Sequence, residues 1–309
     1  MDARLRVVPP HWRSQMLPPP AGYSSSDLIF DDQFNEPSLS AAWNPWIGGP
    51  GGAMWGDWDG QENLLPYPYS GFTTTGLQPM YDDPYPYGGG VGTTGAHLVG
   101  GNGMLSFIAT PSDMFSDLGY SWAAAGISSS SLVLPATGGY VQWDAKMPDS
   151  SAGAWGGLWL LGADGSEMDV QESGYLLGST NPNDVLASNW HDGSPWQVVQ
   201  DTGQDLSADY HTYGLEYVPG QSFTEFLDGQ QMAQWTDNVP FTSFEILTDL
   251  EVAGPDSWFH TVADPSSNPG PFELDVKDIQ VYSLPSTPTP SPTSGSGGGH
   301  YHHHWFAGH

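Results

Sequence analysis

Residues 153–172 read GAWGGLWLLGADGSEMDVQE and join a tryptophan-rich apolar run to a cluster of acids. The apolar run 157–161 is followed by Glu167-Met168-Asp169-Val170-Gln171-Glu172, in which three acids lie within six residues. In a chain of this composition, the pattern Glu-x-Asp-x-x-Glu arises by chance about 0.02 times. Its place on a predicted strand beside tryptophans indicates a functional site.

The spacing of these acids decides which way they point. In a regular strand Glu167, Asp169 and Gln171 share one face and Glu172 points the other way. We predict a β-bulge near Val170 and Gln171, because one inserted residue returns Glu172 to the face of the other acids. Crowding pushes carboxyl pKa values apart, so that one acid is ionised and another protonated, as a retaining glycosidase requires. The alternative is an acidic, solvated strand face, which the neighbouring tryptophans argue against.

The surrounding sequence predicts an all-β domain. Short β-type runs recur between turn signals, with no long helical period between them. They cover residues 103–110, 140–147, 157–162, 167–172, 184–190, 211–218, 222–229, 244–253 and 273–282. The pair Asp228-Gly229 predicts a tight hairpin, and the whole pattern predicts an antiparallel sandwich. Residues 44–95 are crowded with Gly, Pro, Tyr and Trp, and a connection this long is usually functional.

Composition restricts the class of ligand. The 309 residues include 5 basic and 35 acidic ones, which gives a formal charge of −30. This charge repels phosphate and sulfate polymers, so we expect no nucleic acid and no anionic lipid as partner, and a neutral ligand is favoured. The 40 Gly and 28 Pro argue against a helical bundle, and the 14 Trp and 14 Tyr require a folded core. With no cysteine, disulfides and thiolate metal sites are excluded.

The same composition divides the chain into four segments. Residues 1–26 form a Pro-rich N-terminal arm, which we expect to be flexible, and 27–284 form the folded domain. Residues 285–299 form a Ser/Thr/Pro/Gly linker, and 300–309 a His-rich tail that we interpret as solvated rather than metal-binding. No apolar run suits a signal peptide or a membrane span. The remaining composition nevertheless favours an extracellular protein, which we expect to be a monomer.

Three motifs in order resemble glycoside hydrolase family 16, the laminarinase and lichenase group, in its bulged Glu-x-Asp-x-x-Glu form. The resemblance covers about residues 28–284. Residues 153–161 are similar to the family's Gly-x-Trp-Pro-Ala-Phe-Trp-Leu-Leu, with Gly156 in place of Pro. Residues 211–217 resemble its His-x-Tyr-x-x-x-Trp strand, and 226–229 its Tyr-Val-Asp-Gly hairpin.

This resemblance implies a fold and a set of catalytic roles. The fold is a concanavalin-like β-jelly roll, a sandwich of two antiparallel sheets. In the implied mechanism Glu167 is the nucleophile, Asp169 the assisting acid and Glu172 the general acid/base.

Aromatic residues near the acids are candidates for substrate binding. A pyranose presents a C–H face that suits an indole, so Trp155, Trp159 and Trp190 are candidates for sugar stacking. Trp159 lies among apolar neighbours and is ranked below the other two, and Trp258 is a further candidate on a loop. His191 resembles the laminarinase His-x-Gly histidine that reaches toward the catalytic centre, with a surface histidine as the alternative.

Two departures from the family pattern limit what is carried over. Residues 139–146 lack the Glu and Arg of the family's Tyr-Gly-x-x-Glu-x-Arg-x-Lys strand, which weakens any transfer of substrate preference. Lys277 stands where a calcium-ligating Asp often is in the family's C-terminal strand. A structural calcium ion is therefore doubtful, and no cofactor is expected.

Three functions remain open from the sequence. The first is a retaining endo-glycoside hydrolase that cleaves a neutral β-glucan, either β-1,3-glucan or mixed-linkage glucan, by double displacement. The family also includes galactanases and transglycosylases. The second is a carbohydrate-binding jelly roll without turnover, and the third a glycosylated surface or structural protein. The acid triad favours the first, because a lectin needs no second carboxylate at catalytic spacing, and a polysaccharide is then the expected partner.

Overall fold

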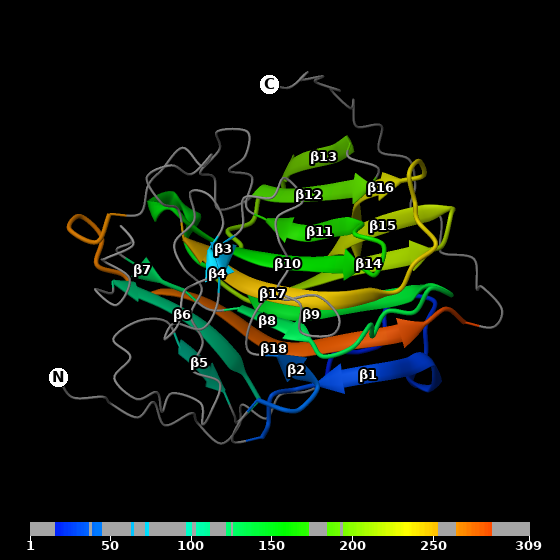
Figure 1. The fold of residues 1–309 in the computed structure, drawn as a ribbon, viewed down its shortest axis with the longest axis horizontal. Helices are drawn as coiled ribbons and strands as arrows, with labels where there is room; N and C mark the ends of the chain where they lie inside the picture. The colour runs from blue at the N-terminus through cyan, green and yellow to red at the C-terminus, as the bar shows by residue number, and fades with distance from the viewer. Residues whose placement is uncertain are drawn as a thin grey trace.

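The computed structural model describes residues 16–36, 39–44, 63–64, 72–73, 97–100, 103–111, 122–124, 126–172, 184–191, 194–252 and 264–285. Within them two large antiparallel sheets stack face to face (Figure 1), which confirms the predicted β-jelly-roll sandwich. In the described part of the chain, no helix has the length and hydropathy needed to cross a bilayer.

Sheet A has nine strands among the described residues. Its strand order is β16 (Gln230–Trp235), β15 (Ser222–Leu227), β14 (His211–Val218), β9 (Gly139–Lys146), β18 (Phe272–Ser283), β6 (Leu105–Pro111) and β5 (His97–Gly100), with β1 (Leu28–Asp32) beside β18 and β7 (Trp122–Ala123) beside β6.

Sheet B, with seven strands in the part of the chain that the structure describes, carries the acidic motif. Its order is β13 (Ser194–Asp201), β12 (Asp184–His191), β11 (Glu167–Glu172), β10 (Ala154–Gly162), β17 (Phe244–Val252), β8 (Gly126–Ser129) and β2 (Trp43–Asn44). A small ribbon pairs β3 (Asn63–Leu64) with β4 (Phe72–Thr73), and the described residues include the short 3-10 turns η1 (Ser25–Asp27) and η3 (Ser150–Ala152). All nine predicted strand runs are found as strands.

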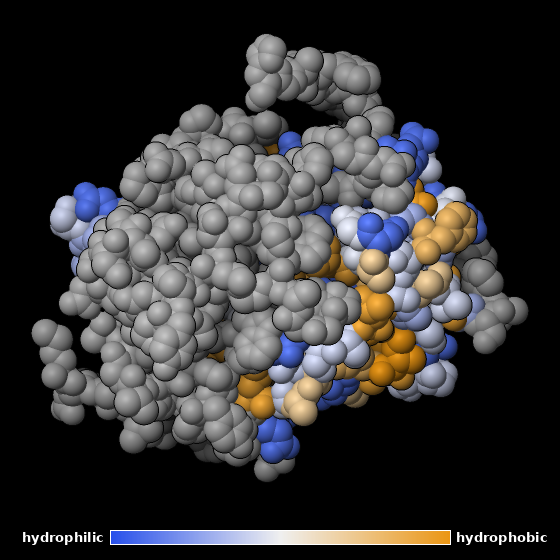
Figure 2. Space-filling view, viewed as in Figure 1, coloured by the Kyte–Doolittle hydropathy of each residue, from blue (hydrophilic) through white to orange (hydrophobic). Residues whose placement is uncertain are grey.

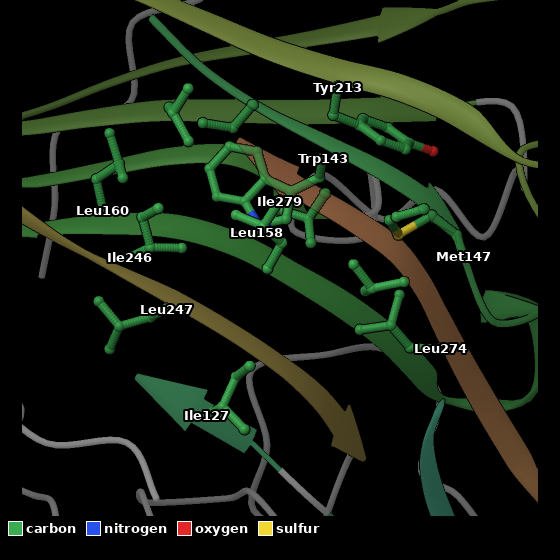
Figure 3. Packing of buried hydrophobic residues seen from close by; sticks show 14 of the residues in the cluster. Ile127, Trp143, Met147, Leu158, Leu160, Tyr213, Ile246, Leu247, Leu274 and Ile279 are labelled. Atoms are coloured by element: carbon green, nitrogen blue, oxygen red, sulfur yellow. The ribbon is translucent and has the colours of Figure 1, made fainter. Parts of the chain in front are cut away.

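The core lies between the two sheets, where alternate residues of each strand point inward. Figure 3 shows Trp143 and Ile279 of sheet A pointing toward Leu158 and Ile246 of sheet B. Trp143 also donates its Nε1 hydrogen to Thr248 Oγ1 across the sandwich, at 3.0 Å. This bond shows which face of β17 is the inner one, so the alternate residues of that strand lie on the outer face of sheet B.

The hairpin that joins β15 to β16 links two of the sequence motifs. Asp228 and Gly229 have φ angles of 50° and 74°, the left-handed backbone of a tight two-residue turn. The Asp228 carboxylate accepts from the Thr212 amide at 2.9 Å and lies 2.8 Å from Nδ1 of His211. The predicted hairpin is confirmed, and the two motifs contact each other in sheet A, where they have a structural role.

The N-terminal segment corrects one prediction. Residues 16–27 lie on the outer face of sheet A, where the Leu17 amide donates to Asp278 Oδ2 at 3.0 Å and Tyr23 donates to Glu216 Oε1 at 3.0 Å. The Tyr23 ring also packs against two sheet tyrosines, Tyr140 and Tyr282. The expectation of a flexible arm is therefore wrong for residues 16–26, because polar and aromatic side chains of the sheet hold them. Residues 1–15, and the linker and tail from residue 286 onward, lie outside the described residues.

The described surface mixes hydrophilic and hydrophobic residues (Figure 2). Within the described residues, three large hydrophobic side chains are exposed, namely Met16, Ile29 and Phe241. Scattered apolar side chains of this kind are ordinary on protein surfaces.

Candidate active site

The acidic motif lies on β11 and contains the predicted bulge. Against β10, Asp169 pairs with Trp159 while Gln171 pairs with Leu158, so Val170 is the extra residue. Against β12, the register shifts between Asp169 and Glu172 in the same way. The bulge at Val170 and Gln171 is confirmed.

The bulge places all three acids on one face. Glu167, Asp169 and Glu172 pair with three alternate residues of β12, which are Trp190, Ser188 and Leu186. Because directly paired residues share a face, the three acids lie together on the outer face of sheet B. The intervening Met168 and Val170 are fully buried in the core. Without the inserted residue, Glu172 would point into the sandwich.

The environment of Glu172 favours its protonated form. Burial, followed by the charges of Asp169 and Asp249, raises the pKa of Glu172 well above its ordinary value. Asp169 is 5% exposed, and Glu167 and Glu172 are half-buried. A carboxyl group that stays protonated beside other carboxylates is suited to donate a proton to a leaving group.

The predicted sugar-stacking residues separate in the structure. Trp155 and Trp159 both point to the outer face of sheet B, but Trp155 is 1% exposed whereas Trp159 is half-buried. This burial favours Trp159 over Trp155 as a stacking residue, the reverse of the order expected from the sequence. The apolar neighbours of Trp159 are Leu158 and Leu160. Both point to the opposite face and belong to the core. Trp159 is the described indole with surface available to a ligand beside the acids.

The other substrate candidates are only partly described. Trp190 and His191 end β12, with Trp190 paired to Glu167 and His191 paired to Ser194. This register places Trp190 at the strand position next to the expected nucleophile. Trp258 lies outside the described residues.

Two further acids adjoin the motif and were missed by sequence reasoning. Asp249 and Glu251 of β17 pair with Gly157 and Trp155 of β10, so they share the outer face with the acids of β11. Asp249 is 1% exposed, and burial raises its pKa to about 7. Strand alternation in residues 244–252 indicates that these acids share a face, because it places Glu245, Leu247, Asp249 and Glu251 on one side of the strand.

No basic side chain is described beside these five acids. The lysines and arginines among the described residues are Lys146 of β9 and Lys277 of β18, both in sheet A. The described residues also contain no group of three or more His, Asp or Glu side chains arranged to hold a metal ion. Lys277, at the position where the family often has a calcium ligand, lies with Nζ 3.2 Å from the centre of the Tyr210 ring. Within the described residues, the negative charge of these acids is therefore reduced by protonation and not by a neighbouring lysine or arginine.

Comparisons with known proteins identify the fold. No family model and no curated protein matches the sequence. Solved structures do match. The laminarinase catalytic domain from Thermotoga maritima MSB8 aligns with a TM-score of 0.59 and 19% identity, over 83% of this chain and 97% of that one.

Two other solved structures also align with most of the chain. The laminarinase from Rhodothermus marinus aligns with a TM-score of 0.57 and 19% identity, over 83% of this chain and 96% of that one. A glycoside hydrolase family 16 endo-glucanase from Bacteroides ovatus aligns with a TM-score of 0.56 and 17% identity, over 82% of this chain and 99% of that one. The chain has the fold of these family 16 glycoside hydrolases.

Proposed function

We propose that the chain is a retaining endo-glycoside hydrolase of the family 16 type that cleaves a neutral β-glucan. The observation that carries the proposal is the bulge on β11, which brings Glu167, Asp169 and Glu172 to one face of sheet B. A solvated acidic strand gains nothing from a bulge that gathers its charges, whereas a retaining glycosidase needs two carboxyl groups on one face.

The proposed reaction is a double displacement. Glu167 attacks the anomeric carbon as a carboxylate while Glu172 donates its proton to the glycosidic oxygen, so the glycosidic bond breaks and a glycosyl ester forms on Glu167. Glu172, now ionised, then takes a proton from water, and that water attacks the anomeric carbon and releases Glu167. Two inversions give a product of retained configuration. Asp169, between the two, orients and tunes its neighbours.

Charge and aromatic surface favour a neutral glucan as the substrate. A chain with a net charge of −30 repels an anionic polymer. The indole of Trp159 offers a face for the C–H surface of a pyranose ring beside the acids. The similar structures include laminarinases, a β-1,3-1,4-glucanase and endo-acting O-glycanases that initiate mucin breakdown. Mucin glycans are often anionic, so β-1,3-glucan and mixed-linkage glucan rank ahead of them.

A reducing-sugar screen tests this proposal. The purified protein is incubated with laminarin, lichenan, barley β-glucan, galactan and mucin, and the products are sized by chromatography. We expect oligosaccharides of several lengths from laminarin or a mixed-linkage glucan. Binding without any product across the panel would favour a carbohydrate-binding jelly roll instead. We further propose that the protein acts as an extracellular monomer, which suits a polymeric substrate that does not enter cells.

A further inference from the structure

The two acids of β17 stand next to the expected catalytic residues. Asp249 pairs with Gly157 and Glu251 pairs with Trp155, and both partners lie on β10, which pairs with β11 on its other side. Together with the three acids of β11, these two carboxyl groups come from the two strands that flank β10, whose own residues 154–162 include no titratable side chain. Asp249 and Glu251 have no role in the double displacement described above.

Gly157 makes room for this pair of acids. The family motif has alanine at this position, and the chain has glycine. A Cβ at residue 157 would overlap Oδ1 of Asp249 and would lie 3.4 Å from Oε1 of Glu251. Both carboxyl groups thus extend over the same stretch of β10, and the glycine is a condition for their placement.

The two oxygens of Asp249 have different environments. Oδ2 accepts a hydrogen bond from Trp159 Nε1 at 3.0 Å. Oδ1 is buried beside Gly157, whose amide lies close enough to the Asp249 carboxyl to lower its pKa, but among the described residues no hydrogen bond of ordinary geometry ends on Oδ1 when every acid is ionised. The Glu251 side chain lies within hydrogen-bonding reach of Asp249, so a proton on Glu251 provides the missing donor.

We propose that Asp249 and Glu251 form a proton-sharing carboxyl pair that positions the Trp159 indole and keeps Glu172 in its acid form. They are positioning residues, since they act through Trp159 and Glu172. Their effect on hydrolysis rests on the proposed function, whereas the shared proton and the hydrogen bond to Trp159 do not.

The electrostatics of the face agree with this arrangement. Besides Glu172, the strands β11, β12 and β17 carry the titratable residues Glu167, Asp169, Asp184, His191, Glu245, Asp249 and Glu251. Of these, Asp169 and Asp249 raise the pKa of Glu172. Burial, then the charges of Asp249 and Glu172, raises the pKa of Glu251 well above its ordinary value. Glu251 is thus the protonated member of the pair, and above about pH 7, where Asp249 is ionised, the charge on Asp249 opposes ionisation of Glu172.

Two substitutions separate the roles of the pair. Asp249→Asn keeps an oxygen that accepts from Trp159 and removes the charge, so the titration midpoint of Glu172 should fall by about one pH unit. Glu251→Gln mimics the protonated acid, because the amide donates to Asp249, and should leave that midpoint close to wild type. Glu245→Gln removes a buried acid from the same face of β17 that does not contribute to the pKa of Glu172, and serves as the control.

The readout is carboxyl-carbon NMR titration of protein labelled with ¹³C at the glutamate side chains. Signals are assigned by their absence in Glu172→Gln and Glu251→Gln, and near-UV circular dichroism verifies the fold of each variant. We expect Glu251 to stay protonated at about pH 6 in the wild type, and Glu172 to shift in Asp249→Asn alone. An ionised Glu251 at that pH, an unmoved Glu172 in Asp249→Asn, or an equal shift in Glu251→Gln would overturn the proposal.

The pH dependence of hydrolysis gives a second readout. The basic limb of kcat/KM should move to lower pH in Asp249→Asn and stay in place in Glu245→Gln. If no polysaccharide is cleaved by the wild-type protein, the proposed function fails, and the titration still decides whether the pair shares a proton.

Discussion

Asp278→Asn should change how the stability of the protein depends on pH. Asp278 lies on the outer face of sheet A, is 0% exposed, and accepts from the Leu17 amide of the N-terminal segment. Burial, opposed by that hydrogen bond and reinforced by Asp31, raises its pKa from 3.8 to about 8. The folded protein therefore holds a proton on Asp278 at pH values where the unfolded chain has released it.

The sign and size of the effect follow from this difference. A raised folded-state pKa gives stability that is fully present below the unfolded pKa and is lost as pH rises through the folded pKa. Between about pH 5 and pH 7 the folded state binds one extra proton, which costs about 1.4 kcal/mol of stability per pH unit, or roughly 2.7 kcal/mol over the interval. Asn keeps the acceptor for Leu17 and cannot titrate, so this part of the slope should vanish.

Urea unfolding at about pH 5, 6 and 7 measures the slope, with Asp205→Asn, an exposed acid on a loop, as the control. The control should run parallel to the wild type, and Asp278→Asn should be flatter by about 1.4 kcal/mol per pH unit. Parallel curves for the wild type and Asp278→Asn would refute the assignment of a proton to Asp278.

Two further predictions concern the catalytic acid and the N-terminal segment. Glu172→Ala should lower kcat by about a hundredfold or more on substrates with poor leaving groups. Added azide should restore turnover and give a β-glycosyl azide as the product, which mass spectrometry and NMR detect. The absence of this product would count against Glu172 as acid/base. Tyr23→Phe removes the hydrogen bond to Glu216 and should lower the free energy of unfolding by about 1 kcal/mol. Tyr23→Ala also removes the ring contacts and should lower it by about 2–3 kcal/mol. Identical thermal melts of the wild type and both variants would show that the docked segment contributes nothing to stability.

The strands and the bulge could be predicted because their signals are local. Alternation of apolar and polar residues gave the strands, and Asp228-Gly229 gave the hairpin. The bulge followed from one requirement, that Glu172 share a face with Asp169. These conclusions needed no knowledge of which strands pair.

The remaining features depend on pairing between distant parts of the chain. Asp249 adjoins the acidic motif only because β17 pairs with β10, and sequence distance hides that contact. The docking of residues 16–26 likewise depends on Asp278 and Glu216, about 190–260 residues away. The exposure of Trp159 follows from strand alternation, since its neighbours Leu158 and Leu160 point to the core and Trp159 points to the outer face.

Glu225 shows the same limit inside sheet A. It lies between Phe223 and Leu227 on the face of β15 that points to the core, and it is 1% exposed. Burial raises its pKa well above the ordinary value. The alternation in residues 222–227 indicates this inward direction, but the pattern alone does not show that a carboxyl group is tolerated there.

A 2-fluoro glycosyl donor can trap the proposed covalent intermediate on Glu167. The protein is incubated with a 2-deoxy-2-fluoro-β-laminaribiosyl donor that carries a good leaving group, and its intact mass and peptides are measured. We expect a stable mass increase equal to one 2-deoxy-2-fluoro-laminaribiosyl group, located on Glu167 and absent from Glu167→Gln. Glu167→Gln should also lose about a thousandfold or more of kcat. A label on another residue, or wild-type turnover by a folded Glu167→Gln protein, would contradict it.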